Sequence, residues 1–394
     1  MTTTELSDYI SNGFERAKHG DALNVYNEIT PYFDRGELPT GRHYAFGWII
    51  YYALHQSTAG QWPERRRMLG NYLKLVLTKP HKLHSMILTE AIRLYRDTPD
   101  NFSIIRFVKL WDLANLRPGD WRRKQLEGKT VNATVEKLVT AYVNESIDQN
   151  LPLSDEFKTV FGRAVKDFAD SPRLQRQRAR LLVAEGNRRD AADIYRRILP
   201  ANRAVYYLWS ELAELLPGPS QRRLKAAMLA MALRTAAHEE FRGKIRIAMA
   251  ETLAAANQYD YALYELDKVK AFYTDKKWHL SPAFVKVRSS IPDGTVAKDP
   301  QPVYDRLVAI ADNYVMQMLP DIEVSKDYHK EGGESRFGKG KTPAAWRVTD
   351  VDGDRYWLMP SRFGIDPNLP IGTMLVTKIA DGKIIHAHLL PDQF

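Results

Sequence analysis

The chain has 394 residues and a formal net charge of +9, and hydrophobic residues make up 44% of it. This is the composition of a folded soluble protein with room for two or three domains. The sequence contains no cysteine, which excludes disulfides, thiol nucleophiles and cysteine-ligated zinc and fits a reducing compartment. The longest apolar run, Tyr44 to Leu54, is about half the roughly 20 residues that a membrane-spanning helix needs. We therefore expect a cytoplasmic protein without a membrane partner.

Residues 1–288 carry a helical pattern, in which apolar residues recur at three- and four-residue spacing and breaks fall at Pro, Gly and Asn. The clearest unit, residues 176–200, places two apolar stripes around a Gly186-Asn187 turn. The same scheme returns at 245–269 and, less regularly, at 209–233. These units resemble the tetratricopeptide repeat, a helical hairpin of roughly 34 residues. The resemblance predicts a mainly α-helical, tetratricopeptide-like repeat array.

An arginine-rich window lies inside this helical region. Ser171 to Ala250 holds 14 Arg and 2 Lys against 7 Asp and Glu, which equals the net charge of the whole chain. The planar guanidinium fork suits phosphate and carboxylate, whereas arginine is also a good helix former that solvates an outer face. Both interpretations stay open, so the window predicts either a surface for phosphate, a surface for an acidic protein, or a solvated face. The basic helical patch consists of Arg173, Arg176, Arg180, Arg188, Arg189, Arg196 and Arg197.

Residues 289–343 are predicted to form a linker. The stretch is rich in Pro, Gly and Asp, contains one amphipathic helix at 303–319, and continues as a polar, glycine-rich and lysine-bearing segment. That segment includes Lys339, Lys341 and the first of two SRFG sequences, at Ser335 to Gly338. We expect this copy to be disordered or to order only on a ligand, because nothing nearby in the sequence can bury Phe337.

The period of the pattern changes from helix to strand in residues 344–394. Residues 344–351 and 355–361 flank a polar turn, and 372–380 and 383–390 form a second pair around another turn. Several short strands in about fifty residues predict a small OB-like β-barrel. Their order resembles that of cold-shock-like OB domains. OB barrels bind single strands through aromatic stacking and cationic grooves.

The barrel supplies the candidates for binding nucleic acid. Trp346 is expected in the core, and the stacking ring is whichever of Tyr356 and Trp357 shares the outer face with Arg347. In the second SRFG copy, at Ser361 to Gly364, Phe363 is expected to cap the barrel while Arg362 points outward. The alternative for each ring is a buried plug, since aromatics dominate small cores. The complete candidate set is Arg347, Tyr356, Trp357, Arg362, Phe363, Lys339 and Lys341.

The sequence offers no catalytic constellation, and we predict no cofactor and no metal site. His386 and His388 share one strand face, but no third ligand follows at a telling spacing. The barrel is also nearly neutral, with 10 Lys and Arg against 9 acidic residues in 326–394. Nucleic acid would therefore bind weakly there or with help from the arginine-rich helices.

Helical repeats that end in a cold-shock-like OB domain resemble the accessory proteins of bacterial TOTE-type genome-conflict loci. The resemblance spans the chain through residues 42–52, the repeat units and residues 346–386. It implies a non-catalytic partner of nucleic-acid-processing enzymes in antiviral defence. The predicted function is therefore an adaptor, whose helices dock a protein while the barrel contacts single-stranded nucleic acid. The alternatives are a purely protein-binding scaffold for an acidic partner and, third, an enzyme.

Overall fold

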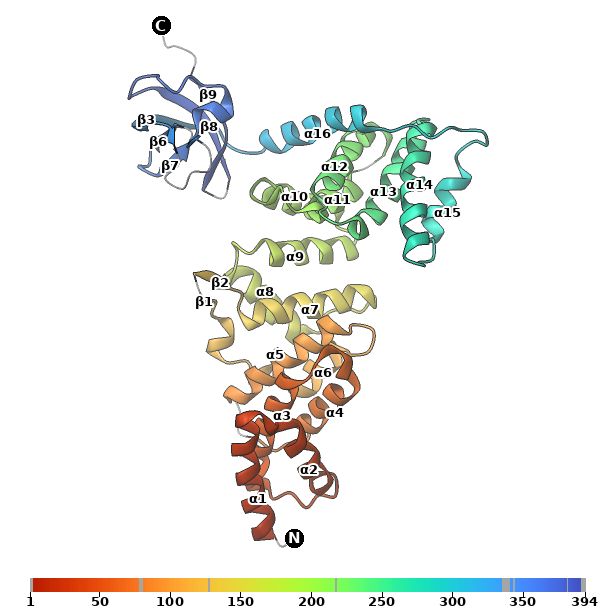
Figure 1. Cartoon of the computed structure of the whole chain (residues 1–394), viewed down its shortest axis with the longest axis vertical. Coiled ribbons are helices and arrows are strands. Elements are labelled where there is room, and N and C mark those ends of the chain that lie inside the picture. Colours follow the sequence, from red (N-terminus) through yellow and green to blue (C-terminus); the bar gives the residue numbers. More distant parts are fainter. Residues whose placement is uncertain are drawn as a thin grey trace. The chain divides into compact units, whose positions relative to one another are not determined.

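The computed structural model describes residues 3–77, 81–126, 128–216, 218–334, 341–342, 344–380 and 382–390. The chain is mainly helical and ends in a sheet that curls into a half-barrel (Figure 1). The predicted fold class, a helical array followed by a small barrel-like domain, is confirmed. The chain divides into two compact units, Met1–Gly186 and Asn187–Phe394. No helix in the described ranges combines the length and the apolar character needed to cross a membrane.

The first unit is built of helices that pack on their sequence neighbours or on the next helix but one. α3 packs on α5, α5 on α7 and α7 on α9, so the elements form a stack in chain order. The helices are α1 (Thr3–Arg16), α2 (Ala22–Asp34), α3 (His43–Gln56), α4 (Trp62–Leu73), α5 (Lys82–Asp97), α6 (Ile104–Trp111), α7 (Thr134–Asp148), α8 (Asp155–Asp167) and α9 (Pro172–Ala184). A short hairpin of β1 (Lys124–Leu126) and β2 (Lys129–Val131) precedes α7.

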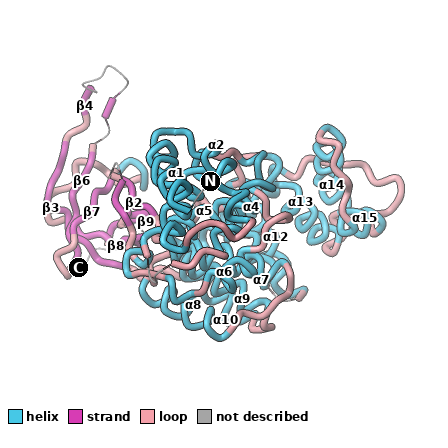
Figure 2. The backbone as a smooth tube through the Cα atoms, turned by 90° about the horizontal axis from the view of Figure 1, so that it is seen from below, coloured by secondary structure: helices cyan, strands magenta, loops and turns pink. Residues whose placement is uncertain are grey.

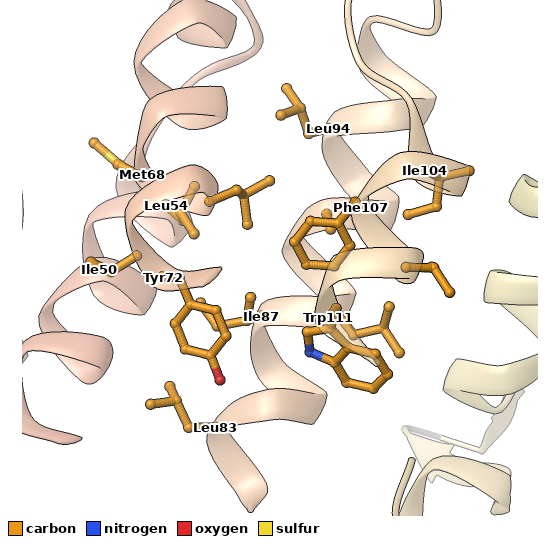
Figure 3. Close-up of a cluster of buried hydrophobic side chains, with 14 of the residues drawn as sticks. Ile50, Leu54, Met68, Tyr72, Leu83, Ile87, Leu94, Ile104, Phe107 and Trp111 are labelled. Atoms are coloured by element: carbon orange, nitrogen blue, oxygen red, sulfur yellow. The ribbon is translucent and has the colours of Figure 1, made fainter. Parts of the chain in front are cut away.

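The core of this unit lies between the apolar faces of successive helices. Figure 3 shows the part between α3, α4, α5 and α6, where aromatic and aliphatic side chains interdigitate. Gly47 of α3 lets α5 approach closely, since a Cβ at this position would lie 2.7 Å from Cδ2 of Leu83. The labelled buried side chains are Ile50, Leu54, Met68, Tyr72, Leu83, Ile87, Leu94, Ile104, Phe107 and Trp111.

The second unit begins with a further helical array. α11 packs on α12, α12 on α13 and α13 on α14, and the apolar stripes predicted for two of the repeat units are buried at Trp209, Leu212, Leu253 and Leu266. The helices are α10 (Arg188–Ile198), α11 (Tyr206–Leu215), α12 (Arg222–Thr235), α13 (Glu239–Ala254), α14 (Tyr259–Asp275), α15 (Pro282–Ser289) and α16 (Gln301–Met316). The turn between α13 and α14 contains Asn257, whose φ is +58°.

α16 belongs to the helical array of the second unit rather than to a linker, because it packs along α12. Its Tyr304 is buried and donates a hydrogen bond to the Glu265 carboxylate of α14 at 2.9 Å. Arg246 of α13 pairs with the same carboxylate at 2.6 Å. A buried acid held by an arginine and a phenol satisfies its acceptors and ties three helices together. Residues 289–343 are thus not simply a linker.

The described residues after α16 include a five-stranded antiparallel sheet in the order β7-β6-β3-β8-β9 (magenta strands in Figure 2). β3 is central and pairs with β6 on one side and β8 on the other. The bridge 359–373 carries the chain from β7 to β8 across β3, and β7 and β9 approach each other, as in a partly open Greek-key barrel. The strands are β3 (Ile322–Lys330), β6 (Ala345–Asp350), β7 (Arg355–Leu358), β8 (Met374–Ala380) and β9 (Lys383–Leu389), with a small separate pair of β4 (Gly333–Glu334) and β5 (Lys341–Thr342).

The two predicted hairpins are present as β6-β7 and β8-β9, but the predicted start of the barrel at residue 344 is wrong. β3 begins at Ile322, inside the predicted linker, and supplies the central strand. Its buried positions Val324 and Lys326 alternate with more exposed neighbours, which is the period-two pattern of a half-buried strand. A lysine at an inward position hides this pattern from a reading based on apolar residues alone.

Candidate nucleic-acid interface

The pairing of β6 with β7 decides which aromatic rings face the barrel and which face outward. Trp346 is fully buried, and its indole Nε1 donates to the Pro367 carbonyl at 3.0 Å, so its predicted core position is confirmed. Arg347 lies opposite Trp357, whereas Val348 lies opposite Tyr356. Because directly opposed residues share a face, Trp357 is the ring beside Arg347.

Tyr356 and Trp357 accordingly differ in their surroundings. Tyr356 packs partly against the barrel core, and its hydroxyl donates to Asp350 at 3.2 Å. Burial and the nearby carboxylate raise the pKa of this phenol. Trp357 is 60% exposed. Because Trp357 shares the outer face with Arg347, Trp357 is the stacking candidate, whereas Tyr356 has a structural role.

β3 adds a residue that sequence reasoning missed. Tyr328 lies opposite Arg347 on the other side of β6 and is 45% exposed. Its ring centroid lies 6.3 Å from that of Trp357 with the two planes at 87°, and 5.5 Å from the Arg347 guanidinium carbon. We call Tyr328, Arg347 and Trp357 the outer row. Two exposed rings flanking a guanidinium across three strands offer faces on which bases can stack.

Asp327 stands next to the outer row because β3 contains a bulge there. The register shifts between Lys326 and Tyr328, which leaves Asp327 as an extra residue on β3. Its carboxylate accepts hydrogen bonds from Nε of Arg347 at 3.2 Å and from the hydroxyl of Thr349 at 2.7 Å. Partial burial by itself would raise the pKa of Asp327, but these two donors outweigh it and hold the pKa below its ordinary value. The carboxylate is therefore charged at neutral pH, and it pairs with the cation of the row.

Behind the row, a buried lysine and Trp346 hold the bridge. Lys326 is 2% exposed, and its ammonium donates to the Leu369 carbonyl and lies 4.2 Å from the ring centroid of Trp346. Desolvation lowers the pKa of Lys326. The two side chains thus anchor the carbonyls of Pro367 and Leu369 in the bridge from below the sheet.

The second SRFG copy forms the short 3-10 turn η8 (Pro360–Phe363) at the start of this bridge. Phe363 packs partly against the barrel core, which includes the buried Ile365. Arg362 is exposed, with its guanidinium carbon 5.8 Å from the Phe363 ring centroid. Gly364 closes the turn with φ +68°, a conformation that favours glycine. These positions agree with the prediction that Phe363 caps the barrel while Arg362 points outward, although Phe363 is only partly buried.

The first SRFG copy, Ser335 to Gly338, and Lys339 lie outside the described residues. Lys341 begins the short strand β5, which pairs with β4. Their predicted part in nucleic-acid binding stays a prediction.

The basic helical patch is divided between the two units. Arg173, Arg176 and Arg180 belong to α9 of the first unit, and the other four belong to α10 of the second. Arg180 is used within its unit, where it donates to the side-chain oxygens of Asn144 and Gln177.

Arginines of the patch on α10 also make hydrogen bonds within the second unit. Arg188 donates to the backbone carbonyl of Glu214, and Arg197 donates to that of Asp193 at 3.2 Å. Arg196 pairs with the Asp193 carboxylate at 2.6 Å and donates to the Tyr314 hydroxyl of α16 at 2.9 Å. Arg189 is exposed. Much of the arginine excess therefore braces helices, and phosphate binding by the patch stays a prediction.

The rings of His386 and His388 lie side by side on β9, with centroids 5.5 Å apart. Within the described ranges, no cluster of three or more His, Cys, Asp or Glu is arranged to hold a metal ion.

Residues 174–311 match a family described as a domain of unknown function, DUF7017. The matched segment covers α9 except its first residues and runs to within α16, so it covers most of the helical array of the second unit and excludes α1 to α8 and the barrel. No curated protein matches the chain.

Proposed function

We propose that this protein is a non-catalytic adaptor whose barrel holds single-stranded nucleic acid on the outer row while its helices dock a protein partner. The observation that supports the barrel's part is the alignment of Tyr328, Arg347 and Trp357 across three neighbouring strands. Burial of large aromatic rings is favourable, so two exposed rings that flank an arginine on one face of the sheet suit a binding surface. The resemblance to accessory proteins of TOTE-type loci would place this activity in defence against foreign DNA.

Stacking would supply most of the affinity. Each stacked base contributes about 1–3 kcal/mol, whereas the charge of the outer face is small. Arg347 is paired with Asp327 at 3.2 Å, which leaves Lys330 and Arg355 as exposed cations on the same face. Few phosphate contacts mean that few counterions are released on binding. The affinity is therefore expected to fall only shallowly with salt.

The helical array supports the second half of the proposal. Stacked helical hairpins expose extended surfaces on which peptides and proteins dock. The first unit also has a cleft of about 500 Å³ where Leu69, Leu73, Phe107 and exposed Leu110 lie beside Arg66. Apolar side chains lined by two arginines, Arg66 and Arg106, against one acid, Asp100, suit a protein segment with an acidic flank.

The experiment is a fluorescence-anisotropy titration of the full chain with labelled DNA and RNA single strands of roughly 12 nucleotides, the scale of an OB-fold site. The titration is repeated at several salt concentrations and with a matching duplex. We expect binding to single strands over duplex, with a shallow salt dependence. Absence of affinity for every DNA and RNA strand at low salt contradicts the proposal.

A further inference from the structure

The acidic residue beside the outer row, Asp327, is unexpected on a surface for nucleic acid. A carboxylate repels phosphates, and the side chain is 30% exposed on the sheet face that carries Tyr328 and Trp357. Its position depends on the bulge in β3, since a regular strand would not place two successive side chains, Asp327 and Tyr328, beside Arg347. Bulges are frequent beside binding sites, where they re-aim a side chain.

The three hydrogen bonds of Asp327 orient its carboxylate and leave one acceptor position free, on Oδ1. An ionised carboxylate has about four acceptor positions. Arg347 Nε and the Thr349 hydroxyl are the donors that orient it. The bonds from Arg347 involve Nε and not the two terminal nitrogens of the fork. A base stacked on Trp357 or Tyr328 would therefore meet an acceptor and the end of an arginine fork at its edge.

The chemistry of the bases decides which of them this edge suits. Guanine presents two adjacent donors, N1–H and the N2 amino group, either of which can donate to the free acceptor position on Oδ1 of Asp327. Thymine and uracil flank their single N3–H with two carbonyls, which a carboxylate repels. Unstacked bases of single strands are read along these edges, and arginine suits the O6 and N7 acceptors of guanine.

We infer that Asp327 is a specificity-determining residue that makes the outer row prefer guanine over thymine or uracil in a single strand. The inference rests on the proposed function and adds to it the base that the site selects. The carboxylate weakens the attraction of this surface for phosphates, but it allows the surface to discriminate between base edges. Arg347 is held by Asp327 so that its fork points at the same base.

The test compares three labelled DNA single strands of roughly 12 nucleotides, titrated against the full chain in lithium buffer to suppress guanine quartets. One is oligothymidine, one carries two separated guanines in place of thymines, and one carries inosines at the same positions. Inosine lacks only the N2 amino group of guanine. We expect the guanine strand to bind about tenfold more tightly than oligothymidine, on the scale of one hydrogen bond to a charged group, with the inosine strand between them.

The variants are Asp327→Asn and, as a control, Glu323→Gln. Glu323 is an exposed acid on the same strand, opposite Val376 and away from the row, so its substitution removes one negative charge without touching the base edge. Asp327→Asn is expected to abolish the preference for guanine over inosine and to strengthen oligothymidine binding. Glu323→Gln is expected to keep the guanine preference.

Three results overturn the inference. Equal affinity of the wild-type chain for all three strands overturns it while the proposed function stands. A guanine preference that survives in Asp327→Asn shows that another residue reads the base. Binding to none of the strands overturns the inference together with the proposed function.

Discussion

Substitution of Phe363 by alanine tests whether, in the second SRFG sequence, Phe363 stabilises the barrel while Arg362 contacts the single strand. The ring packs against the barrel core but keeps part of its surface in solvent. Truncation of a fully buried phenylalanine costs about 3–5 kcal/mol, so we expect roughly half, about 2 kcal/mol, for this ring. Arg362 is exposed and lies over the ring rather than in the core. Its alanine variant should change stability by no more than about 0.5 kcal/mol, as at other surface positions.

Hydrogen exchange of the full chain, followed in peptides from β6 and β7, measures the opening of the barrel alone. A loss of about 2 kcal/mol speeds exchange of their protected amides roughly thirtyfold, since each 1.4 kcal/mol is a factor of ten. Arg362→Ala should leave this exchange unchanged and weaken single-strand binding. Unaltered exchange in Phe363→Ala would refute the capping assignment, and the second SRFG would then be the better stacking site.

Two further predictions concern packing and pH. Gly47→Ala is expected to destabilise the first unit by about 1–3 kcal/mol relative to Gly70→Ala, because its Cβ would meet Leu83 of α5 at 2.7 Å whereas a Cβ at Gly70 meets nothing within 4 Å. Gly70→Ala itself should be stabilising by up to about 1 kcal/mol through helix propensity, and thermal unfolding in which both variants shift alike would show that α3 and α5 do not approach as described. Lys326 has a lowered folded pKa because it is desolvated, so the unfolded chain binds more protons and this group stabilises the barrel increasingly as pH rises towards the ordinary lysine value of about 10.4. The difference in barrel hydrogen-exchange protection between wild type and Lys326→Met should therefore grow in favour of wild type through this alkaline range, and a difference independent of pH would contradict the assignment.

The helical array could be predicted from the sequence because its cause is local. Apolar side chains at three- and four-residue spacing bury one face of a helix wherever that helix packs, and Trp209, Leu253 and Leu266 are buried as their positions in the pattern indicate. The β6-β7 and β8-β9 hairpins were equally accessible, since each is two alternating runs around a polar turn.

The central strand was missed because its pattern is broken at two places. Lys326 occupies an inward position, where its ammonium is satisfied by the Leu369 carbonyl 43 residues away, and a partner so distant cannot be read from local sequence. The bulge at Asp327 then shifts the alternation by one residue. The alternation of Ile322, Val324 and Lys326 was the available signal.

The candidate site was predicted only in part for the same reason. Arg347 and Trp357 could be named from one hairpin, with the choice between Trp357 and Tyr356 left to the register. Tyr328 and Asp327 join them only through pairing of β3 with β6. The arginine window shows the opposite limit, since a charge count cannot reveal that Arg180 and Arg196 donate to Asn144 and Tyr314.

The outer row is tested most directly by single-strand binding of Trp357→Ala, with Val351→Ala as the matched control. Both side chains are exposed, Val351 at 85% in the turn of the same hairpin, so neither substitution should alter barrel protection in hydrogen exchange. Loss of one stacked base, worth about 1–3 kcal/mol, predicts binding roughly 5- to 150-fold weaker for Trp357→Ala, and wild-type affinity for Val351→Ala. Wild-type affinity in a folded Trp357→Ala variant would contradict the account, because the ring that the structure exposes beside Arg347 would then hold no base.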